Sequence, residues 1–446
     1  MLRQLGPVFA RTTERLVQEV EGLGYPLEMD EDLDPLLDRI GDSRLVLLGE
    51  ASHGTSDYYT WRARLSRRLI EEKGFSFIAV EGDWPDCYAI NRYIKNYQDA
   101  GDSAFDVLQQ FERWPTWMWA NWEVAALAEW LRAHNDRHPQ GRKAGFYGLD
   151  VYSLWESMHE VMGYLETNDP EIMDTARRAF LCFEPYGQDV QAYARATALV
   201  PKDCEDEVVD LLSEVRRGVR DYPGDPHADF NAEQNAYVLA EAEHYYRTMV
   251  HGGGDSWNVR DYHMIDTLDR LLQHHEQTWD GVPRGIVWQH NTHIGDARYT
   301  DMADAGMVNV GQLARERHED EGVVLVGFAS YQGSVIAGAE WGAPMARMRV
   351  PPGQPGSWES ALHEAHDGDS LLLMDELRDA PSAEQWRGHR AIGVVYHPDY
   401  EYGNYVPTVL PRRYDALLYI DDSEALHPLH LQADRDKPPE LYPWGL

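Results

Sequence analysis

Acidic and histidine side chains follow three short apolar runs of this sequence. Glu50 and His53 come after the run RLVLLG, Glu81 ends the run FSFIAVE, and His290 and His293 come after RGIVWQ. In open α/β sheets, ligands bind beyond the carboxyl ends of the strands, so side chains at such positions are placed to meet a substrate. Burying these groups without partners costs several kcal/mol, and core packing gives no reason for it. The sequence therefore predicts that the five side chains share one site.

This set of side chains suits two kinds of hydrolysis. In the first, His53 removes a proton from water, a carboxylate orients the histidine, and the other histidines with an arginine stabilise the developing oxyanion. In the second, the five side chains bind a divalent metal ion that activates the water. The spacing His290-x-x-His293 is compatible with a metal ion but lacks the helical HExxH frame. A serine hydrolase is disfavoured, because a nucleophile elbow around Ser52 needs glycine at position 50.

The elements that position these side chains read as an alternation of buried strands and helices. Strands that are apolar throughout and separated by helices such as Tyr58–Lys73 and Asp86–Tyr97 are typical of a parallel sheet covered on both faces. We therefore predict an α/β fold with a mainly parallel central sheet flanked by helices. The expected strands are Arg44–Gly49, Phe75–Glu81, Ala144–Leu149, Arg284–Gln289, Val323–Phe328, Ser370–Met374, Ala391–Tyr396 and Ala416–Ile420.

The middle of the chain has a different pattern. From Leu154 to about His275 no strand is indicated, and long amphipathic stretches such as Glu205–Val219 and Ala232–Met249 dominate. We predict that residues 1–153 and 276–446 are two parts of one α/β core, and that residues 154–275 are an inserted helical subdomain. A block inserted between strand ends that carry site residues is well placed to cover the cleft as a lid. The Pro/Gly-rich stretch Pro351–Gly356 is expected to be a loop.

Composition narrows the classes of partner. The chain has 446 residues, of which 43% are hydrophobic, so it can bury a large core and is not a disordered chain. Asp and Glu number 76 against 40 Lys and Arg, a net charge of −36 that repels phosphate backbones and disfavours nucleic acid. Lysines are scarce. An acidic, lysine-poor surface predicts adaptation to concentrated salt, which screens the self-repulsion. The expected partner is a small-molecule substrate of moderate size.

The sequence also bears on cellular location. No apolar run approaches the ~18–20 residues needed to cross a bilayer, and the first residues lack the apolar region of a signal peptide. The three cysteines, Cys87, Cys182 and Cys204, show no CxxC spacing and cannot all pair. A disulfide framework and a zinc-ribbon site are therefore not expected, and a reducing, cytoplasmic location is predicted.

Several longer runs resemble one known family. GEASHGTSDYYTWR (Gly49–Arg62) and VEGDWP (Val80–Pro85) are similar to motifs of the erythromycin esterase-like family. The runs WPTWMW, FYGLDVYS, SWNVRDYHM, VWQHNTHIGDAR and NVGQLARE agree with it as well. The resemblance covers nearly the whole chain and is closest to the family's broad, uncharacterised group. Ala120 stands where an arginine often follows TWMW, and Tyr262 interrupts the usual charged stretch, so macrolide recognition is disfavoured.

The resemblance implies an α/β core, a helical subdomain and a cleft between them. It also implies ester hydrolysis, with His53 as base, Glu50 and Glu81 as acids, Arg62 nearby, and His290 and His293 completing the site. It leaves open whether the enzyme needs no cofactor or one divalent metal ion. The candidate substrate-binding residues are Trp84, Trp117, Trp119, Arg260, Asp261 and Asn291.

Some alternatives stay open at this point. Arg260 and Asp261 read either as a supporting pair behind the site or as the start of a helix. The tryptophans around Trp117 read more readily as core than as a substrate wall. Two further functions compete with ester hydrolysis. One is metal-dependent hydrolysis of an amide or lactone, and the other is a non-enzymatic protein that binds a metal ion or a tetrapyrrole.

Overall fold

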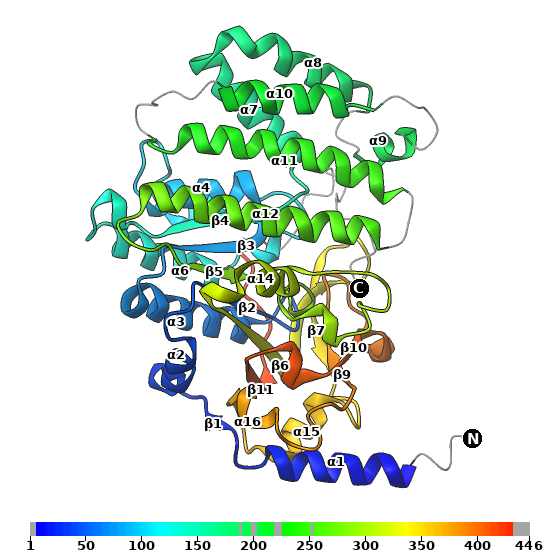
Figure 1. The fold of residues 1–446 in the computed structure, drawn as a ribbon. Coiled ribbons are helices and arrows are strands. Elements are labelled where there is room, and N and C mark those ends of the chain that lie inside the picture. Colours follow the sequence, from blue (N-terminus) through cyan, green and yellow to red (C-terminus); the bar gives the residue numbers. More distant parts are fainter. Residues whose placement is uncertain (1–5, 187–189, 198–202, 218–224, 251–253, 431–446) are drawn as a thin grey trace.

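A nine-stranded sheet forms the centre of the molecule (Figure 1). The computed structural model describes residues 6–186, 190–197, 203–217, 225–250 and 254–430. Six strands run parallel in the spatial order β11-β6-β2-β5-β3-β4. They are β2 (Leu45–Leu48), β3 (Phe77–Asp83), β4 (Gly145–Asp150), β5 (Gly285–Trp288), β6 (Val323–Gly338) and β11 (Ala416–Ser423).

Antiparallel strands complete the sheet. Strand β8 (Ser370–Leu373) pairs with β11, β1 (Tyr25–Pro26) pairs with β8, and β7 (Met345–Val350) pairs with the distal part of β6. A separate two-stranded sheet consists of β9 (Arg387–Arg390) and β10 (Tyr405–Thr408). The expected α/β fold with a central sheet flanked by helices is thus confirmed, and the predicted strand Ser370–Met374 corresponds to β8, whereas β1, β7, β9 and β10 have no counterpart among the predicted strands.

One of the eight expected strands is wrong. Residues 391–396 do not form a strand, and β9 instead precedes them. Their apolar pattern arises because the segment packs on the distal part of β6 and on β7, where Ile392 and Tyr396 share a cluster with Val335, Ala337 and Val350. There it makes only isolated bridges, from Ile392 to Ser52 and from Val395 to Gly338. Pro351–Gly356 has no regular structure and connects β7 to α15 (Trp358–Ala365), as expected for a loop.

Helices cover both faces of the sheet because alternate side chains of each strand enter two different hydrophobic clusters. On one face, Val46 and Leu48 pack with α2 (Asp34–Ile40), α3 (Ser56–Lys73) and α6 (Trp122–Asn135). On the other, Leu45 and Leu47 pack with α1 (Gly6–Val20), α12 (Asp255–Thr278), α14 (Val310–His318) and α15. This arrangement explains why the parallel strands are apolar throughout.

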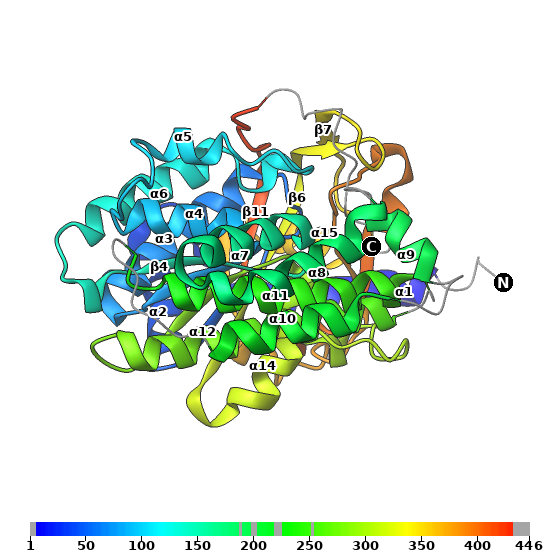
Figure 2. The ribbon, with the colours of Figure 1, turned by 90° about the horizontal axis from the view of Figure 1, so that it is seen from above.

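A layer of helices lies beyond α12, at the top of Figure 1, and Figure 2 shows the same helices from above. They are α7 (Leu154–Asn168), α8 (Met173–Phe183), α9 (Val190–Thr197), α10 (Glu205–Arg217) and α11 (Ala228–Met249). Their apolar side chains share a third hydrophobic cluster. Among the described residues between positions 154 and 278 there is no strand. The predicted helix 205–219 corresponds to α10, and its last two residues lie outside the described residues.

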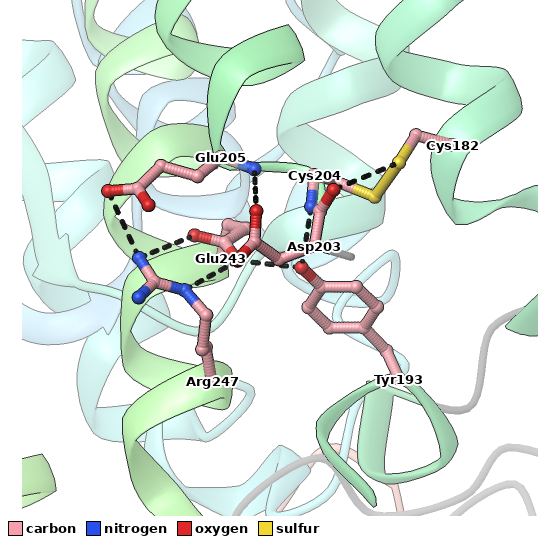
Figure 3. The surroundings of a disulfide bond; sticks show 7 residues. All are labelled: Cys182, Tyr193, Asp203, Cys204, Glu205, Glu243 and Arg247. Carbon is pink, nitrogen blue, oxygen red and sulfur yellow. Dashed lines mark hydrogen bonds and ion pairs between the residues drawn. A yellow bond between two sulfur atoms is a disulfide. The ribbon is translucent and has the colours of Figure 1, made fainter. Parts of the chain in front are cut away.

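A disulfide joins two of these helices, contrary to the expectation from the sequence (Figure 3). Cys182, near the end of α8, is bonded to Cys204, just before α10, whereas Cys87 is free and buried. The Tyr193 hydroxyl lies beside this bond, where it accepts the Cys204 N–H at 3.0 Å. Spacing along the chain gave no signal for this pair, because the two cysteines meet only through the packing of α8 on α10.

Candidate active site

The structure brings the five predicted side chains together at the carboxyl edge of the parallel strands. Glu50 and His53 occupy the loop between β2 and α3, and Glu81 lies in β3. His290 follows β5, and His293 lies on the short helix α13 (Asn291–Ile294). The rings of His53 and His290 are 4.9 Å apart between centroids. Glu81 accepts the backbone N–H of His290 at 2.8 Å. This hydrogen bond links the end of β3 to the residues that follow β5.

His53 is held by a chain of buried charged groups. Its Nδ1–H donates to Glu50 Oε1 at 2.9 Å, and Arg62 Nη2 donates to the other carboxylate oxygen at 2.8 Å. Arg62 lies on α3, is fully buried, and its guanidinium packs over the rings of Tyr59 and Trp288. With Nδ1 as the donor, the other ring nitrogen of His53, Nε2, carries a lone pair when the ring is neutral.

The pKa of His53 is shifted upward. Burial by itself lowers the pKa of this imidazole, but the hydrogen bond to Glu50 and the charge of Glu81 outweigh burial. The same neighbourhood acts in the opposite direction on Glu81. Burial raises the pKa of Glu81, yet interactions with His293 and Arg260 hold that pKa far below its ordinary value. Glu81 is therefore ionised at neutral pH and places a negative charge beside His53.

A second set of contacts is centred on Arg260, on α12. Its Nη2 donates to Glu81 Oε1 at 2.7 Å, while Nε and Nη2 donate to the two oxygens of Asp150 at 2.9 and 2.7 Å. Asp150 ends β4, so this arginine connects two neighbouring strands. The bidentate contact fixes the plane of the guanidinium and directs its remaining Nη1 toward His293.

His293 is engaged at both ring nitrogens. Arg260 Nη1 donates to Nε2 at 3.0 Å, and Nδ1–H donates to Asp261 at 2.9 Å. The ring also stacks on Trp257, with centroids 4.5 Å apart. Because neither nitrogen is available to take a proton from water, this arrangement makes His293 a member of the supporting framework and not the base.

His290 presents a different tautomer. Its Nδ1 accepts the backbone N–H of Thr292 at 3.3 Å and lies 2.8 Å from the Thr292 hydroxyl, which can also donate to it; with Nδ1 as the acceptor, a neutral ring carries its proton on Nε2. Burial and the neighbouring His53 hold the pKa of His290 well below its ordinary value, so the ring is neutral. The Nε2 atom is buried and has no hydrogen-bond partner among the described residues. His290 thus carries an N–H group beside His53, and an interaction with the backbone of Ala51 opposes the lowering of its pKa.

These groups adjoin a cavity of about 350 Å³. His53, Glu81, His290, His293 and Arg260 all line it. Most of the remaining wall is aromatic or otherwise apolar. These wall residues include Phe111, Trp114, Met118, Trp119, Tyr152, Tyr245, Trp257, Met307 and Trp341. A cavity that is mostly apolar, with a few convergent polar groups, is typical of a small-molecule site.

Four of the predicted substrate-binding residues do not line this cavity, and two of them, Trp84 and Trp117, lie in the hydrophobic core. Trp84 packs against Tyr88 and Tyr147 on the α12 side of the sheet, and Trp117 is fully buried in the cluster on the other side. The structure thus places these two residues in the core and away from the cavity, where they have packing partners. Trp119 does line the cavity, and its Nε1 donates to the carbonyl of Glu81 at 3.1 Å.

The other three predicted binding residues mainly support the site. Arg260 lines the cavity but is saturated by carboxylates, and Asp261 lies behind His293. Asn291 also supports the carboxyl edge of the sheet from outside the cavity. Its backbone N–H donates to the carbonyl of Glu50, and its side chain donates to the carbonyl of Phe328 in β6. Neither Asp261 nor Asn291 lines the cavity.

Sequence reasoning missed Asp150 and Trp257. Asp150 stands directly after the expected strand Ala144–Leu149, so the rule that located the other site residues also applied to this strand end. Trp257 lies on a helix, where nothing in the sequence distinguishes a ring that stacks on a site histidine from one in the core.

The side chains are arranged for hydrogen bonding and not as metal ligands. Both oxygens of Glu81 and both nitrogens of His293 are engaged, and Arg260 places a positive charge inside the set. Within the part of the chain that the structure describes, no group of three or more His, Cys, Asp or Glu is placed to hold a metal ion.

Fold and site together define a mixed α/β protein with a histidine–carboxylate cavity at the carboxyl edge of its sheet. The sequence profile of the erythromycin esterase family matches residues 70–423, and the chain belongs to this family. Erythromycin esterase type II of Escherichia coli is 30% identical over 162 residues, which are 35% of this chain and 36% of that protein. The alignment thus spans about a third of that relative's length.

Three solved structures share the fold. A Bacillus cereus protein superposes with a TM-score of 0.75 at 19% identity, covering 94% of this chain and 99% of that chain. A succinoglycan biosynthesis protein gives 0.73 at 22% identity, covering 93% and 98%. A mutant of the erythromycin esterase EreC in its open conformation gives 0.64 at 17% identity, covering 92% and 96%. At such identities the likeness concerns the fold alone. Among the described residues, no helix has the length and apolar character needed to span a membrane.

Proposed function

We propose that this protein is a hydrolase of carboxylic esters, with His53 as the general base that activates water. Family membership supports a hydrolase. The observation that carries the proposal is the tautomer of His53: Glu50 holds Nδ1–H, and no hydrogen bond to Nε2 is found among the residues that the structure describes. The deciding experiment is a panel of esters of different acyl and alcohol size, assayed with the wild-type protein and a His53 variant.

The reaction begins with a water molecule in the cavity, beside His53 Nε2 and the ester. The water transfers a proton to Nε2 while the water oxygen attacks the carbonyl carbon of the ester. The imidazolium formed is stabilised by Glu50, to which it is already hydrogen-bonded, and by the charge of Glu81. When the tetrahedral intermediate collapses, the carbon–oxygen bond to the alcohol breaks. The same nitrogen then returns the proton to the leaving alkoxide, so His53 ends the cycle neutral.

The tetrahedral intermediate carries a negative charge on the former carbonyl oxygen. We assign its stabilisation to His290, whose ring lies beside His53 and is fixed in place by Thr292 before substrate arrives. A preorganised donor of this kind stabilises developing charge without reorganising in the reaction. Arg260 contributes less directly, since its N–H groups are directed at Glu81, Asp150 and His293.

Replacing Glu50 by glutamine is expected to move the acidic limb of the pH–kcat/KM profile to lower pH. In the wild type, the base must be neutral, so activity falls as pH drops through a His53 pKa that lies above its ordinary value. Glutamine removes the charge that raises this pKa and weakens the hold on the tautomer, so kcat falls as well. The profile of Glu276→Gln, which alters an exposed glutamate paired with Arg44, serves as control. A limb that stays in place in Glu50→Gln contradicts the role of His53.

The helical layer formed by α7–α11 is proposed to act as a lid that sets specificity. Tyr245 on α11 and Tyr152, just before α7, contribute to the cavity wall, while the sheet supplies the catalytic groups. Exchanging residues 154–275 between two family members with different substrates is therefore expected to exchange their substrate preference. If the preference follows the sheet-bearing segments instead, the helices are support for the core and not a lid.

The acidic composition is proposed to reflect adaptation to salt. A net charge of −36 destabilises the compact state by self-repulsion, and raising salt from 0.01 M to 1 M shortens the Debye length from about 30 Å to about 3 Å. The melting temperature is therefore expected to rise steeply with NaCl. Sucrose, an uncharged osmolyte, is the control that separates screening from solute exclusion. A melting temperature that stays flat in NaCl rules out the adaptation.

A further inference from the structure

A second buried histidine–carboxylate pair lies outside the cavity, and the reaction above does not use it. His389 on β9 places its Nδ1 atom 2.8 Å from Oε1 of Glu359 on α15. Both side chains are almost fully buried, and neither lines the cavity. The backbone N–H of Arg390 donates to the same carboxylate oxygen at 2.8 Å, which fixes the carboxylate in place. The pair repeats the contact between His53 and Glu50.

The charge states of this pair determine which nitrogen of His389 carries the proton. Burial raises the pKa of Glu359, but the hydrogen bond from His389 and the charge of Arg390 hold that pKa below its ordinary value, so the carboxylate is ionised. Burial lowers the pKa of His389 and outweighs the effect of Glu359, so the ring is neutral. An ionised carboxylate only accepts hydrogen bonds. Nδ1 of His389 therefore carries the proton, and Nε2 is left as an acceptor.

That acceptor meets the side-chain amide of Asn291, which is fully buried. The Nδ2 atom of Asn291 lies 3.3 Å from Nε2 of His389. The orientation of the amide is fixed by β6, since Oδ1 accepts the backbone N–H of Phe328 at 3.2 Å and Nδ2 donates to the carbonyl of Phe328 at 2.7 Å. The amide nitrogen has two N–H groups, so the second is left for His389. Without that acceptor this N–H is buried and unsatisfied, and turning the amide away from Phe328 is the way to relieve it.

Asn291 contacts the catalytic groups through its backbone. Its N–H donates to the carbonyl of Glu50 at 2.8 Å, and it directly follows His290 in the chain. Gly49 allows the segment after β2 to come this close, because a Cβ atom there would lie 2.1 Å from Oδ1 of Asn291. The position of Asn291 therefore determines where the backbones of Glu50 and His290 lie, and thus where Glu50 meets His53.

We propose that His389 is a positioning residue of the reaction: it holds the side chain of Asn291 and, through Asn291, the backbone of Glu50 and His290. Its part in catalysis rests on the proposed function, whereas its link to the backbone of the site does not. Stability is a poor explanation for the pair, because burying the charge of Glu359 costs free energy that an apolar pair of similar volume does not.

The test compares two amide side chains at position 389. His389→Asn keeps a partner for Glu359 but ends short of Asn291, whereas His389→Gln can present an oxygen acceptor in place of Nε2. His389→Asn is expected to lower kcat for the best ester of the panel by about 10- to 100-fold, the upper value being the cost of misplacing reacting groups by about 1 Å. KM is expected to stay within about twofold, because His389 does not line the cavity. His389→Gln is expected to restore most of kcat.

A second variant covers the case in which His389→Asn does not fold. Glu359→Gln combined with His389→Leu removes the buried charge and the acceptor together and keeps an acceptor for the N–H of Arg390. This double variant is expected to melt near the wild-type temperature while kcat falls as in His389→Asn. The matched control is His318→Asn. His318 also bonds to a carboxylate, that of Asp269, but it lies outside the cavity at the end of α14, so kcat is expected to be unchanged.

The pKa of His53, followed by NMR in histidine-labelled protein, is a readout that needs no turnover. Burial lowers this pKa and the hydrogen bond to Glu50 raises it. A displaced Glu50 therefore leaves the pKa of His53 lower in His389→Asn than in the wild type, and His389→Gln is expected to restore it.

Unchanged kcat and an unchanged His53 pKa in a folded variant without the acceptor overturn the proposal. A loss of kcat that His389→Gln does not restore also overturns it, since the ring and not the acceptor is then responsible. If the wild type cleaves no ester while the His53 pKa still follows the acceptor at position 389, the proposed function fails and the positioning link stands. Ester cleavage by a wild type whose variants keep their kcat and His53 pKa does the reverse.

Discussion

Replacing His53 by alanine is expected to lower kcat/KM for esters by about 10²–10⁴, the range that general acid–base catalysis contributes. The loss follows from the position of the ring, because it lines the cavity and is the imidazole whose Nδ1–H is fixed by a carboxylate while Nε2 stays available. Initial rates on the best ester of the panel measure the effect. Circular dichroism and thermal melting report whether the fold is kept, as expected while Arg62 still neutralises Glu50.

The control is His427→Ala, which removes an exposed histidine outside the cavity and leaves the rate unchanged. Wild-type turnover by a folded His53→Ala protein would falsify the assignment of the base. The remaining candidates are then few, since His293 has both nitrogens engaged and His290 holds its proton on the nitrogen without a partner.

Replacing Arg62 by methionine is expected to lower the free energy of unfolding by about 3 kcal/mol, near the lower end of the range for breaking a buried ion pair. Arg62 and Glu50 are both almost fully buried, so the variant leaves a carboxylate without its charged partner. The loss lies at the lower end because His53 still bonds to Glu50. Denaturant unfolding at neutral pH provides the measurement.

Two variants separate charge from packing in this experiment. Arg67→Met changes an exposed arginine on the same helix and is expected to alter stability by no more than about 0.5 kcal/mol. The double variant Glu50→Gln with Arg62→Met removes the orphaned charge and should regain part of the lost stability. If Arg62→Met is as stable as Arg67→Met, Glu50 does not depend on Arg62 for its burial.

Most strands of the sheet could be predicted from apolar runs in the sequence. A parallel strand covered on both faces is apolar at every position, so it stands out as a continuous run. The same runs placed Glu50, Glu81 and His290, since the carboxyl end of a strand follows directly from its last apolar residue. Antiparallel additions such as β7, with exposed arginines, carry no such signal.

Contacts that depend on tertiary packing could not be predicted in this way. Arg260 and Asp261 are neighbours on one helix, yet one faces the cavity and the other braces His293 from behind. The orientation of α12 over the sheet decides this, and periodicity alone does not give it. The bond between Cys182 and Cys204 depends in the same way on how α8 meets α10.

The sheet order has a consequence for how this chain folds during synthesis. Strand β2, which ends at the loop of Glu50 and His53, pairs only with β5 and β6: Leu48 lies beside Trp288 and Val326. A ribosome adding 5–20 residues per second leaves β2 without either neighbour for on the order of ten seconds or more. Throughout that interval an apolar strand with two open edges is exposed, which is the form most prone to pair with other chains. Yield in the cell should therefore depend on chaperones that bind the first half of the nascent chain until the second half emerges.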